Sequence, residues 1–412
     1  MTETLKDNPQ MEQNNLQDNN GLYVEGSIPS IIKYMGSKRA IIEYVVEGIN
    51  ECYTGGTVVD LFAGSSVLSG ALRNQVPMTS NDIQQYSSVL AKTYLSSYDW
   101  DKYPNILQNV LIEAGEIVNT FKAVHPNLVF NYNREFTLEE FNELEKEQQE
   151  LINMDFSTFP YHLFVKNYSG TYWNFEQCLW IDAMREVADR YKDEPVFYPI
   201  LASLMFAMSY NSQSTGHYAQ YRDAKDIKSM EDILIYRRKD IASFFERKFT
   251  EFQQTLGENP LQHKVVSLDY MDCLESIENN STVYADPPYC FVHYSRFYHA
   301  IETLVRYDYP EVKFKGRYRT DRHQSPFCIK TKVKKAFQSM FEKINEKQSN
   351  LVLSYSDTGM IEADEVIQIA KNTFDDNYSI EFRLQDYAHS TMGRKEDKSR
   401  NVLECLILIK RL

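Results

Sequence analysis

The chain has 412 residues, with 58 Asp and Glu against 44 Lys and Arg, and its formal net charge is −14. This length allows one large α/β domain with an insertion, or two domains, and a substantial core. Six cysteines are scattered without a CxxC pair, which argues against a disulfide framework or a thiolate zinc site and favours a reducing, cytoplasmic environment. The acidic net charge does not exclude a nucleic-acid partner, because binding depends on where the charges lie.

The N-terminal part of the chain begins with a polar tail and continues as alternating helix and strand patterns. Residues 1–26 are rich in Asn, Gln and acids and have little to bury, so we expect a disordered tail. The patterns at 38–53 (KRAIIEYVVEGINECY) and 65–75 (SSVLSGALRNQ) are typical of helices. Strand candidates lie at 57–62 and 78–82.

More than 150 residues separate the second strand candidate from the third, which is far too many for a crossover. We therefore expect residues 95–260 to form a mostly helical inserted domain that recognises the substrate. Within it, 138–152 (LEEFNELEKEQQELI) predicts a polar, solvated helix. The apolar stretch 195–210 (PVFYPILASLMFAMSY) is too short to span a bilayer comfortably, so we expect a buried helix and no membrane association.

Strand patterns resume after the insertion. The candidates are 264–269, 282–289, 351–356, 379–384 and 402–410. Several are continuous β-branched or apolar runs, as strands covered on both faces must be. The sequence therefore predicts an α/β fold with a doubly wound, Rossmann-like sheet of about seven strands, largely parallel, whose last two strands form an antiparallel pair. Residues 27–94 and 261–412 are its two parts.

The first strand candidate runs into VVDLFAGSSVLSG, in which an acid at the strand end precedes a Gly/Ser turn and a helix. In open α/β sheets ligands bind beyond the carboxyl ends of the strands, and a turn of small residues lets the backbone approach them. This predicts a nucleotide-like cofactor. A dinucleotide fold is the weaker alternative, since GxGxxG is absent. Asp82 ends the second strand and suits either binding of ribose hydroxyls or capping of the next helix.

A second motif ends the strand candidate at 282–289, where STVYADPPYC continues from an apolar run into an acid, two prolines and a tyrosine. Asp-Pro is ordinary turn chemistry, so this motif by itself fits a simple chain reversal as well as a functional site.

Together these motifs resemble the Dam-type (alpha-class) adenine-specific DNA methyltransferases, over most of residues 31–410 in scattered blocks. IKYMGSKRAII resembles the family's opening motif, with Tyr34 in the usual place of Trp, and DLFAGSS resembles its Asp-x-Phe-x-Gly-x-Gly cofactor loop. LDY at 268–270 resembles the Asp-aromatic pair, and ADPPY the Asp-Pro-Pro-Tyr motif. Ser66 replaces the second glycine of the loop, so we expect a turn without positive φ there.

The resemblance implies S-adenosylmethionine as the cofactor. It places Asp82 at the ribose and the LDY pair at the cofactor's adenine. The implied cofactor-binding residues are Lys33, Tyr34, Gly36, Lys38, Asp60, Phe62, Gly64, Asp82, Asp269 and Tyr270. The implied catalytic residues are Asp286, Pro287, Pro288 and Tyr289.

The chemistry expected at DPPY follows from the weak nucleophilicity of the 6-amino nitrogen of adenine, whose lone pair is delocalised into the ring. The Asp286 carboxylate and the Pro287 carbonyl can accept its two hydrogens, in a backbone that the prolines make rigid. Tyr289 can stack on a base taken out of the duplex. Positioning and electrostatics then supply the rate, without a metal. Cys290 and His293 are two isolated candidate ligands and do not make a metal site.

Double-stranded DNA is the expected partner. The segment 306–335 has ten Lys or Arg against three Asp or Glu, with tyrosines between them, which indicates a DNA-contacting face or else a solvated basic surface. A second basic loop lies at 389–400. Residues 209–223 (SYNSQSTGHYAQYRD) loosely resemble the family's recognition hairpin, with base readout through Asn211 or Arg222. The expected DNA-binding residues are Tyr210, Asn211, Arg222, Lys313, Arg317, Arg319, Arg322 and Arg394.

Four other functions stay open. The same motif type also serves methylation of the 4-amino group of cytosine, or of RNA or a protein amide, although Asp286 favours adenine. A non-catalytic DNA-binding regulator that retains the cofactor is the alternative from another class. The pattern leaves the target sequence, and the choice between monomer and dimer, open.

Overall fold

The structure is a computed structural model that describes residues 21–24, 26–213, 217–288, 294–356, 359–389 and 400–412. The predicted disordered tail therefore lies almost entirely outside the described residues. Its last part is attached to the rest of the protein, because the backbone N–H of Leu22 donates to Asn50 at 2.8 Å and that of Tyr23 donates to Gln75 at 2.9 Å.

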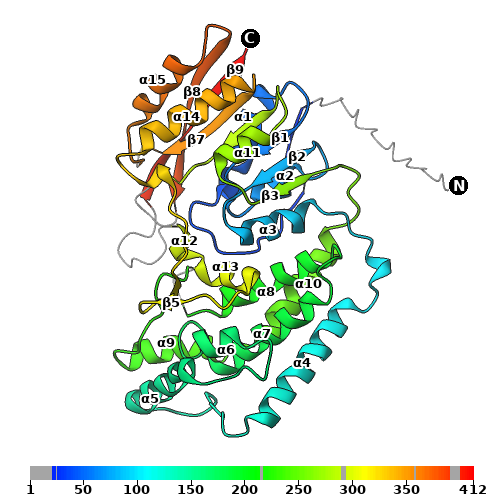
Figure 1. Ribbon diagram of the computed structural model, residues 1–412, viewed down its shortest axis with the longest axis vertical. Coiled ribbons are helices and arrows are strands. Elements are labelled where there is room, and N and C mark those ends of the chain that lie inside the picture. Colours follow the sequence, from blue (N-terminus) through cyan, green and yellow to red (C-terminus); the bar gives the residue numbers. More distant parts are fainter. Residues whose placement is uncertain (1–20, 25, 214–216, 289–293, 357–358, 390–399) are drawn as a thin grey trace, which may run out of the picture.

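Seven strands form one sheet in the order β3-β2-β1-β4-β7-β9-β8 (Figure 1). Their bounds are β1 Val58–Asp60, β2 Met78–Asn81, β3 Lys264–Val266, β4 Thr282–Ala285, β7 Asn350–Ser356, β8 Tyr378–His389 and β9 Arg400–Arg411. The strands β3, β2, β1, β4 and β7 are parallel, whereas β9 is antiparallel to both of its neighbours. The predicted doubly wound sheet, with its terminal antiparallel pair, is confirmed.

Helices cover both faces of this sheet because successive side chains of a strand point to opposite sides. On one face Val58 and Val352 pack against α1, α2 and α3. On the other face Val59 and Leu351 pack against α11, α14 and α15. Burial of each such side chain contributes roughly 1.5–3 kcal/mol. These helices are α1 Ile42–Cys52, α2 Val67–Leu72, α3 Gln85–Leu95, α11 Tyr270–Ser276, α14 Val333–Glu346 and α15 Ala363–Thr373.

A layer of helices lies beside the sheet, in the lower half of Figure 1. Between β2 and β3 it contains α4 Ile106–Val124, α5 Leu138–Gln149, α6 Leu163–Tyr168, α7 Phe175–Asp189, α8 Phe197–Asn211, α9 Ile227–Arg237 and α10 Ile241–Thr255. The later elements α12 Tyr294–Phe297, α13 His299–Arg306, β5 Val312–Lys313 and β6 Tyr318–Arg319 follow β4. Since Ile301 and Leu304 of α13 share one core with α3 and α8, the layer is assembled from two separate stretches of chain.

Four short 3-10 helices complete the described secondary structure: η1 Lys38–Ile41, η2 Trp100–Lys102, η3 Glu150–Asn153 and η4 Pro326–Cys328.

The apolar stretch at 195–210 forms α8, which is buried on nearly all sides, so its prediction as a buried helix is confirmed. It packs against α10, α7 and α3, and these neighbours leave little of its surface to water. Among the described residues, no helix has the length and apolar character needed to cross a membrane.

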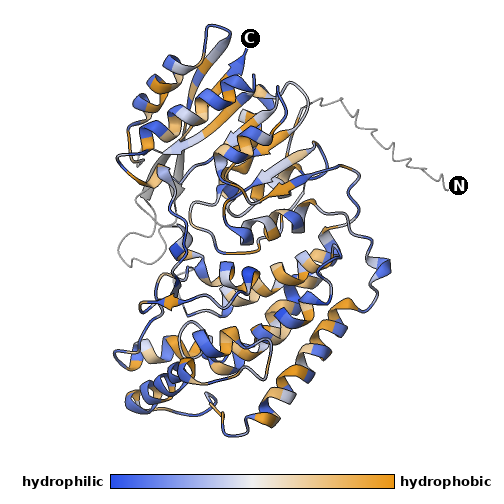
Figure 2. Cartoon of the chain, in the orientation of Figure 1, coloured by the Kyte–Doolittle hydropathy of each residue, from blue (hydrophilic) through white to orange (hydrophobic). Residues whose placement is uncertain are grey.

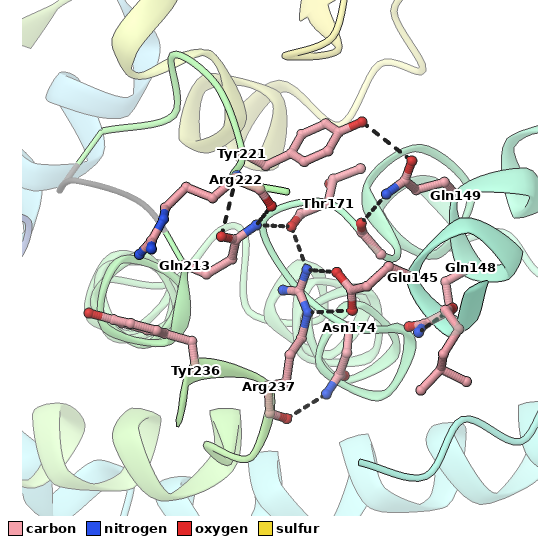
Figure 3. Close-up of polar contacts among 12 residues, drawn as sticks. Glu145, Gln148, Gln149, Thr171, Asn174, Gln213, Tyr221, Arg222, Tyr236 and Arg237 are labelled. Carbon is pink, nitrogen blue, oxygen red and sulfur yellow. Dashed lines mark hydrogen bonds and ion pairs between the residues drawn. The ribbon is translucent and has the colours of Figure 1, made fainter. Parts of the chain in front are cut away.

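Helix α5 is coloured mostly as hydrophilic in Figure 2, in agreement with the predicted polar helix. One of its faces is nevertheless buried, so the predicted polar helix is not solvated there. Arg237 donates through Nε and Nη2 to the carboxylate of Glu145, at 2.9 and 2.5 Å, and through Nη2 to the Thr171 carbonyl at 2.6 Å (Figure 3). The bidentate pair replaces the hydration that both charges lose.

Candidate active site

One pocket lies beyond the carboxyl ends of the parallel strands, where open α/β sheets bind their ligands. Its walls come from segments that follow β1, β2, β3 and β4, from the chain before α1, and from residues 323–326 with Cys328. Residues far apart in the sequence therefore meet here. The predicted cofactor and catalytic residues that line this pocket are Tyr34, Gly36, Lys38, Asp60, Phe62, Gly64, Asp82, Asp269, Tyr270, Asp286, Pro287 and Pro288.

The turn after β1 brings the backbone close to the pocket. Gly64 has a φ of 50°, and a Cβ added to it would lie 2.7 Å from the Tyr34 hydroxyl. A side chain at this position would therefore collide with the pocket wall. Tyr34 itself is held by stacking on Tyr298, with ring centroids 4.7 Å apart.

Ser66, two residues later, has a φ of 56° and a ψ of 29°, so the expectation of a turn without positive φ is wrong. A non-glycine residue in this left-handed region costs about 1–2 kcal/mol. Local hydrogen bonds offset part of this cost: the Ser66 N–H donates to the Ala63 carbonyl at 2.6 Å, and Oγ donates to the Ser87 carbonyl at 3.1 Å. Serine thus takes over the position that the resemblance assigned to glycine.

Asp82 joins the Gly/Ser turn to the start of α3. One carboxylate oxygen accepts from the Gly64 N–H and the other from the Gln84 N–H, both at 2.9 Å. Burial raises the pKa of Asp82 to about 6, although the two backbone hydrogen bonds act in the opposite direction. Both sequence interpretations therefore have a structural basis, because Asp82 orders the helix entry and also lines the pocket.

Asp60 at the end of β1 is 2% exposed, and its Oδ1 has no hydrogen-bond partner among the described residues. Burial raises its pKa well above the usual value, and the negative charges of Asp286 and Asp82 raise it further. Carboxylates gathered in a buried space favour a cationic ligand, which would relieve their mutual repulsion.

An aromatic wall forms another side of the pocket. The rings of Phe62 and Tyr270 are stacked with centroids 5.9 Å apart, and Phe327 packs edge-on against both. Asp269 caps α11 by accepting from the Met271 N–H at 3.0 Å. A flat apolar surface beside a carboxylate suits a nucleobase with hydrogen-bonding edges.

Asp286 follows β4 and is held by a buried lysine. Lys38 Nζ lies 3.2 Å from Asp286 Oδ1 and 2.6 Å from Glu404 Oε1, and Ser354 donates to the same Glu404 oxygen at 2.5 Å. Burial raises the pKa of Asp286 to about 7, with Lys38 lowering it and Glu404 raising it. Lys38 and Glu404 therefore act in opposite directions on the charge of Asp286.

Glu404 was missed by the sequence predictions, although a signal for it exists. It is a single acid in the otherwise apolar run VLECLILIK, and an isolated charge in a covered strand requires a partner. The segment after residue 322 was also assigned to DNA rather than to this pocket. Here Cys328 donates through Sγ to the Pro288 carbonyl at 3.2 Å, which helps to fix the backbone of the motif.

Several predictions fall on residues outside the structural description, namely Tyr289, Cys290, His293 and Arg394. Among the residues that the structure does describe, no group of three or more His, Cys, Asp and Glu side chains is arranged to hold a metal ion.

A family model described as D12 class N6 adenine-specific DNA methyltransferase matches residues 34–369. The chain belongs to this family. The match includes the cofactor-type turn, the helical layer and the Asp286 motif, and it confirms the resemblance to Dam-type enzymes.

Three curated relatives show how this D12-class chain compares with longer and shorter proteins. Type II methyltransferase M.FokI of Planomicrobium okeanokoites is 25% identical over 349 residues, which are 83% of this chain and 47% of that protein. Modification methylase LlaI of Lactococcus lactis subsp. lactis is 22% identical over 390 residues, 92% of this chain and 55% of that protein. Type II methyltransferase M.NlaIII of Neisseria lactamica is 21% identical over 348 residues, which are 82% of this chain and 87% of that protein. The chain thus spans about half the length of the first two relatives.

The basic segment of this D12-class chain, 306–335, is less free to meet DNA than its composition indicates. Arg319 is 2% exposed and donates to Asp308 at 2.6 and 2.7 Å and to Asp321 at 3.1 Å. Arg317 donates through its guanidinium to the carbonyls of Asn167 and Gln149. Arg317 thereby joins the β5–β6 hairpin to α6 and α5, whereas Arg319 is paired within its own segment. Their assignment as DNA contacts stays a prediction.

The other two predicted cations of this segment are more accessible. Lys313 has a half-exposed side chain paired with Glu311 at 3.1 Å. Arg322 donates through Nε to the Arg319 carbonyl at 3.0 Å and packs over the Tyr318 ring, 4.9 Å from its centroid.

The predicted recognition segment 209–223 begins as the end of α8 rather than as a hairpin strand. Asn211 is fully buried and donates to the Ala207 carbonyl at 2.7 Å, so its side chain is not exposed in this conformation and base readout by Asn211 stays a prediction. Gln213 donates to the carbonyls of Thr171 and Arg222, at 2.8 and 3.0 Å, and thereby joins the two ends of the segment (Figure 3).

Two further predicted residues also have partners elsewhere. The Arg222 side chain pairs with Asp232. Lys33 is absent from the pocket wall, and its Nζ lies 4.5 Å from the centroid of the Tyr210 ring. Tyr210 is half-buried at the end of α8.

Proposed function

We propose that the chain transfers a methyl group from S-adenosylmethionine to the exocyclic 6-amino group of an adenine flipped out of double-stranded DNA. The observation that carries this proposal is Asp286, which lines the pocket after β4 with its side chain 19% exposed and lies 3.2 Å from Lys38. Membership of the D12 class supports adenine as the target. The names of the relatives, type II methyltransferase and modification methylase, support a role in restriction and modification.

The pocket fits the proposed cofactor, which combines a nucleoside with a positively charged sulfonium. The partnerless Oδ1 of Asp60 and the raised pKa of its carboxyl indicate a site that gains from a nearby cation. Asp82 is available to ribose hydroxyls, and Phe62 with Tyr270 offers a surface for the adenine ring. When bound, the cofactor supplies an electrophilic methyl group.

The residues after β4 hold the target amino group. The Asp286 carboxylate accepts one N–H and the Pro287 carbonyl accepts the other, which draws the nitrogen lone pair toward the methyl group. After transfer of the methyl group that the cofactor would supply, the amino group would lose one proton, which the Asp286 carboxylate would accept. Lys38 positions Asp286, and Glu404 balances the charge of Lys38.

The surface that we propose for contact with DNA contains fewer residues than the sequence predicted. Lys313, Arg322 and Tyr210 stay candidates for contacts with the duplex, whereas Arg317, Arg319 and Asn211 have structural partners. Tyr289 and Arg394 lie outside the described residues, and their roles at the flipped base and at the DNA rim stay predictions.

The test is transfer of labelled methyl from S-adenosylmethionine to duplex DNA, followed by chromatography of the nucleosides. We expect N6-methyladenine from the wild type and none from Asp286→Ala, which should retain cofactor binding in calorimetry because its carboxylate is assigned to the substrate. N4-methylcytosine as the product, or wild-type activity of Asp286→Ala, would contradict the proposal. Cofactor binding without transfer to any DNA would favour the non-catalytic regulator.

A further inference from the structure

A cluster of aromatic rings at the end of α8 and the start of α10 is surrounded by cations. The rings of Phe206 and Tyr210 lie 4.4 Å apart, and the Phe244 ring is stacked on Tyr210 at 6.3 Å. Lys33 Nζ lies 4.5 Å from the Tyr210 centroid, and the Arg247 guanidinium lies 4.8 Å from that of Phe244. Lys239, Tyr236 and Lys248 complete the cluster, which we name the basic-aromatic patch.

The charge of this patch is unbalanced. Among the described residues, Lys33, Lys239 and Arg247 form no ion pair with a carboxylate, whereas Lys248 pairs with Glu251. Burial lowers the pKa of Lys239, and the positive charges of Lys33 and Arg247 lower it further. Three cations held close together without an anion are unfavourable in the isolated chain, and a polyanion that contacts all of them would remove this repulsion.

In the basic segment 306–335, several cations have carboxylate partners. Arg319 pairs with Asp308 and Asp321, Lys315 with Asp223, and Lys334 with Glu365. Cations that already have carboxylate partners release fewer counterions from a phosphate chain. These pairs neutralise part of the positive charge at 306–335, while Lys330, Lys332 and Lys335 are exposed without a carboxylate partner among the described residues. The patch differs in that its unpaired cations lie on aromatic rings.

The patch is directly connected to the pocket. Lys33 precedes Tyr34, whose ring lines the pocket wall. Lys239, in the connection between α9 and α10, donates through Nζ to the Tyr210 carbonyl at 2.9 Å, which fixes this connection to the predicted recognition segment. A duplex whose adenine enters the pocket has its phosphates nearby, and aromatic faces beside cations suit sugar-phosphate and base contacts.

We propose that the basic-aromatic patch binds the sugar-phosphate backbone of the duplex beside the flipped adenine, with Lys239 and Arg247 as its phosphate contacts. The inference rests on the proposed function for the identity of the partner. It adds Lys239, Arg247 and Phe244 to the DNA surface and moves Lys33 from the cofactor to that surface.

The test measures the affinity of the full chain for a fluorescent duplex of about 30 base pairs at increasing salt. Each phosphate contact contributes about 0.9 to the slope of log affinity against log salt. We expect the double variant Lys239→Ala, Arg247→Ala to reduce this slope by about 1.8. The matched control is Lys315→Ala, Lys334→Ala, which removes the same charge from residues that are already paired and should leave the slope unchanged.

Folding is checked by thermal melting. Because Lys239 also holds the Tyr210 carbonyl, the single variant of the exposed Arg247 tests the charge alone, and Arg247→Lys should restore the wild-type slope. A normally melting Arg247→Ala whose slope equals that of the wild type, or a control pair that lowers the slope equally, would overturn the inference. A wild type that binds duplex with this salt dependence but never methylates adenine would contradict only the proposed function.

Discussion

Glu404 and Lys38 are predicted to shift the pH dependence of methyl transfer in opposite directions. Asp286 must be ionised to accept the amino hydrogen, so activity should rise with pH through its pKa, which burial raises to about 7. Glu404→Gln removes a negative charge that raises this pKa, and Lys38→Met removes a positive charge that lowers it. The acid limb should therefore move to lower pH in the first variant and to higher pH in the second.

The size of the shift follows from the geometry. Lys38 Nζ lies 3.2 Å from Asp286 Oδ1 and 2.6 Å from Glu404 Oε1, so the two carboxylate oxygens are at most about 5.8 Å apart. At an effective dielectric constant of about 20, two unit charges at that distance interact by about 3 kcal/mol, which is equivalent to about 2 pKa units. Asp60 also faces Asp286 but is unchanged in both variants.

The assay is the initial rate of methyl transfer to duplex DNA at low substrate concentrations between pH 5 and 9, for the wild type and both variants. Lys38→Met leaves the buried Glu404 and the partly exposed Asp286 without their cation and should cost about 3–5 kcal/mol of stability. The double variant Lys38→Met, Glu404→Gln should melt closer to the wild type and serves as the folding control. The proposed positioning of Asp286 would be refuted if the acid limb of the pH–rate profile moved in the same direction in both variants. It would also be refuted if the limb stayed in place while only the maximal rate fell.

Further outcomes are expected at other sites. Asp82→Ala should weaken S-adenosylmethionine binding by roughly 1–3 kcal/mol, because it removes a polar partner of the ribose, and calorimetry on folded protein checks this. Tyr289→Phe should stay partly active while Tyr289→Ala loses much activity on duplex DNA, with 2-aminopurine fluorescence reporting base flipping; normal flipping and methylation by Tyr289→Ala would exclude stacking. Asp182→Asn should lower the free energy of unfolding by about 2–5 kcal/mol, since Asp182 accepts from two backbone N–H groups and the Tyr307 hydroxyl; an unchanged urea midpoint would contradict this. Burial raises the pKa of Asp182 to about 7 and that of Asp82 to about 6. The contribution of these two groups to stability is therefore greatest below the pKa of the unfolded chain and is lost as pH rises through the folded-state values. Melting curves from pH 4 to 8 would show this loss.

The sequence by itself determined the sheet and the pocket wall that it supports. Continuous apolar strands indicate a covered parallel sheet, and the acids that end them, such as Asp60, Asp82 and Asp286, must meet at one edge because parallel strands end together. The Gly/Ser turn and the DPPY motif could also be assigned, because each is a short run of characteristic residue types. These features depend on residues that are neighbours in the chain, so local sequence patterns predict them.

Tertiary structure decided which charges are available and which are neutralised. Lys38 and Glu404 are 366 residues apart in sequence and 2.6 Å apart in the fold, and only the pairing of β9 with β7 brings them together. Arg319 and Arg247 are equally basic in the sequence, yet Arg319 is buried between two aspartates and Arg247 lies exposed on aromatic rings. Charge density along a chain cannot distinguish them, because the availability of a cation depends on the carboxylates that folding places beside it.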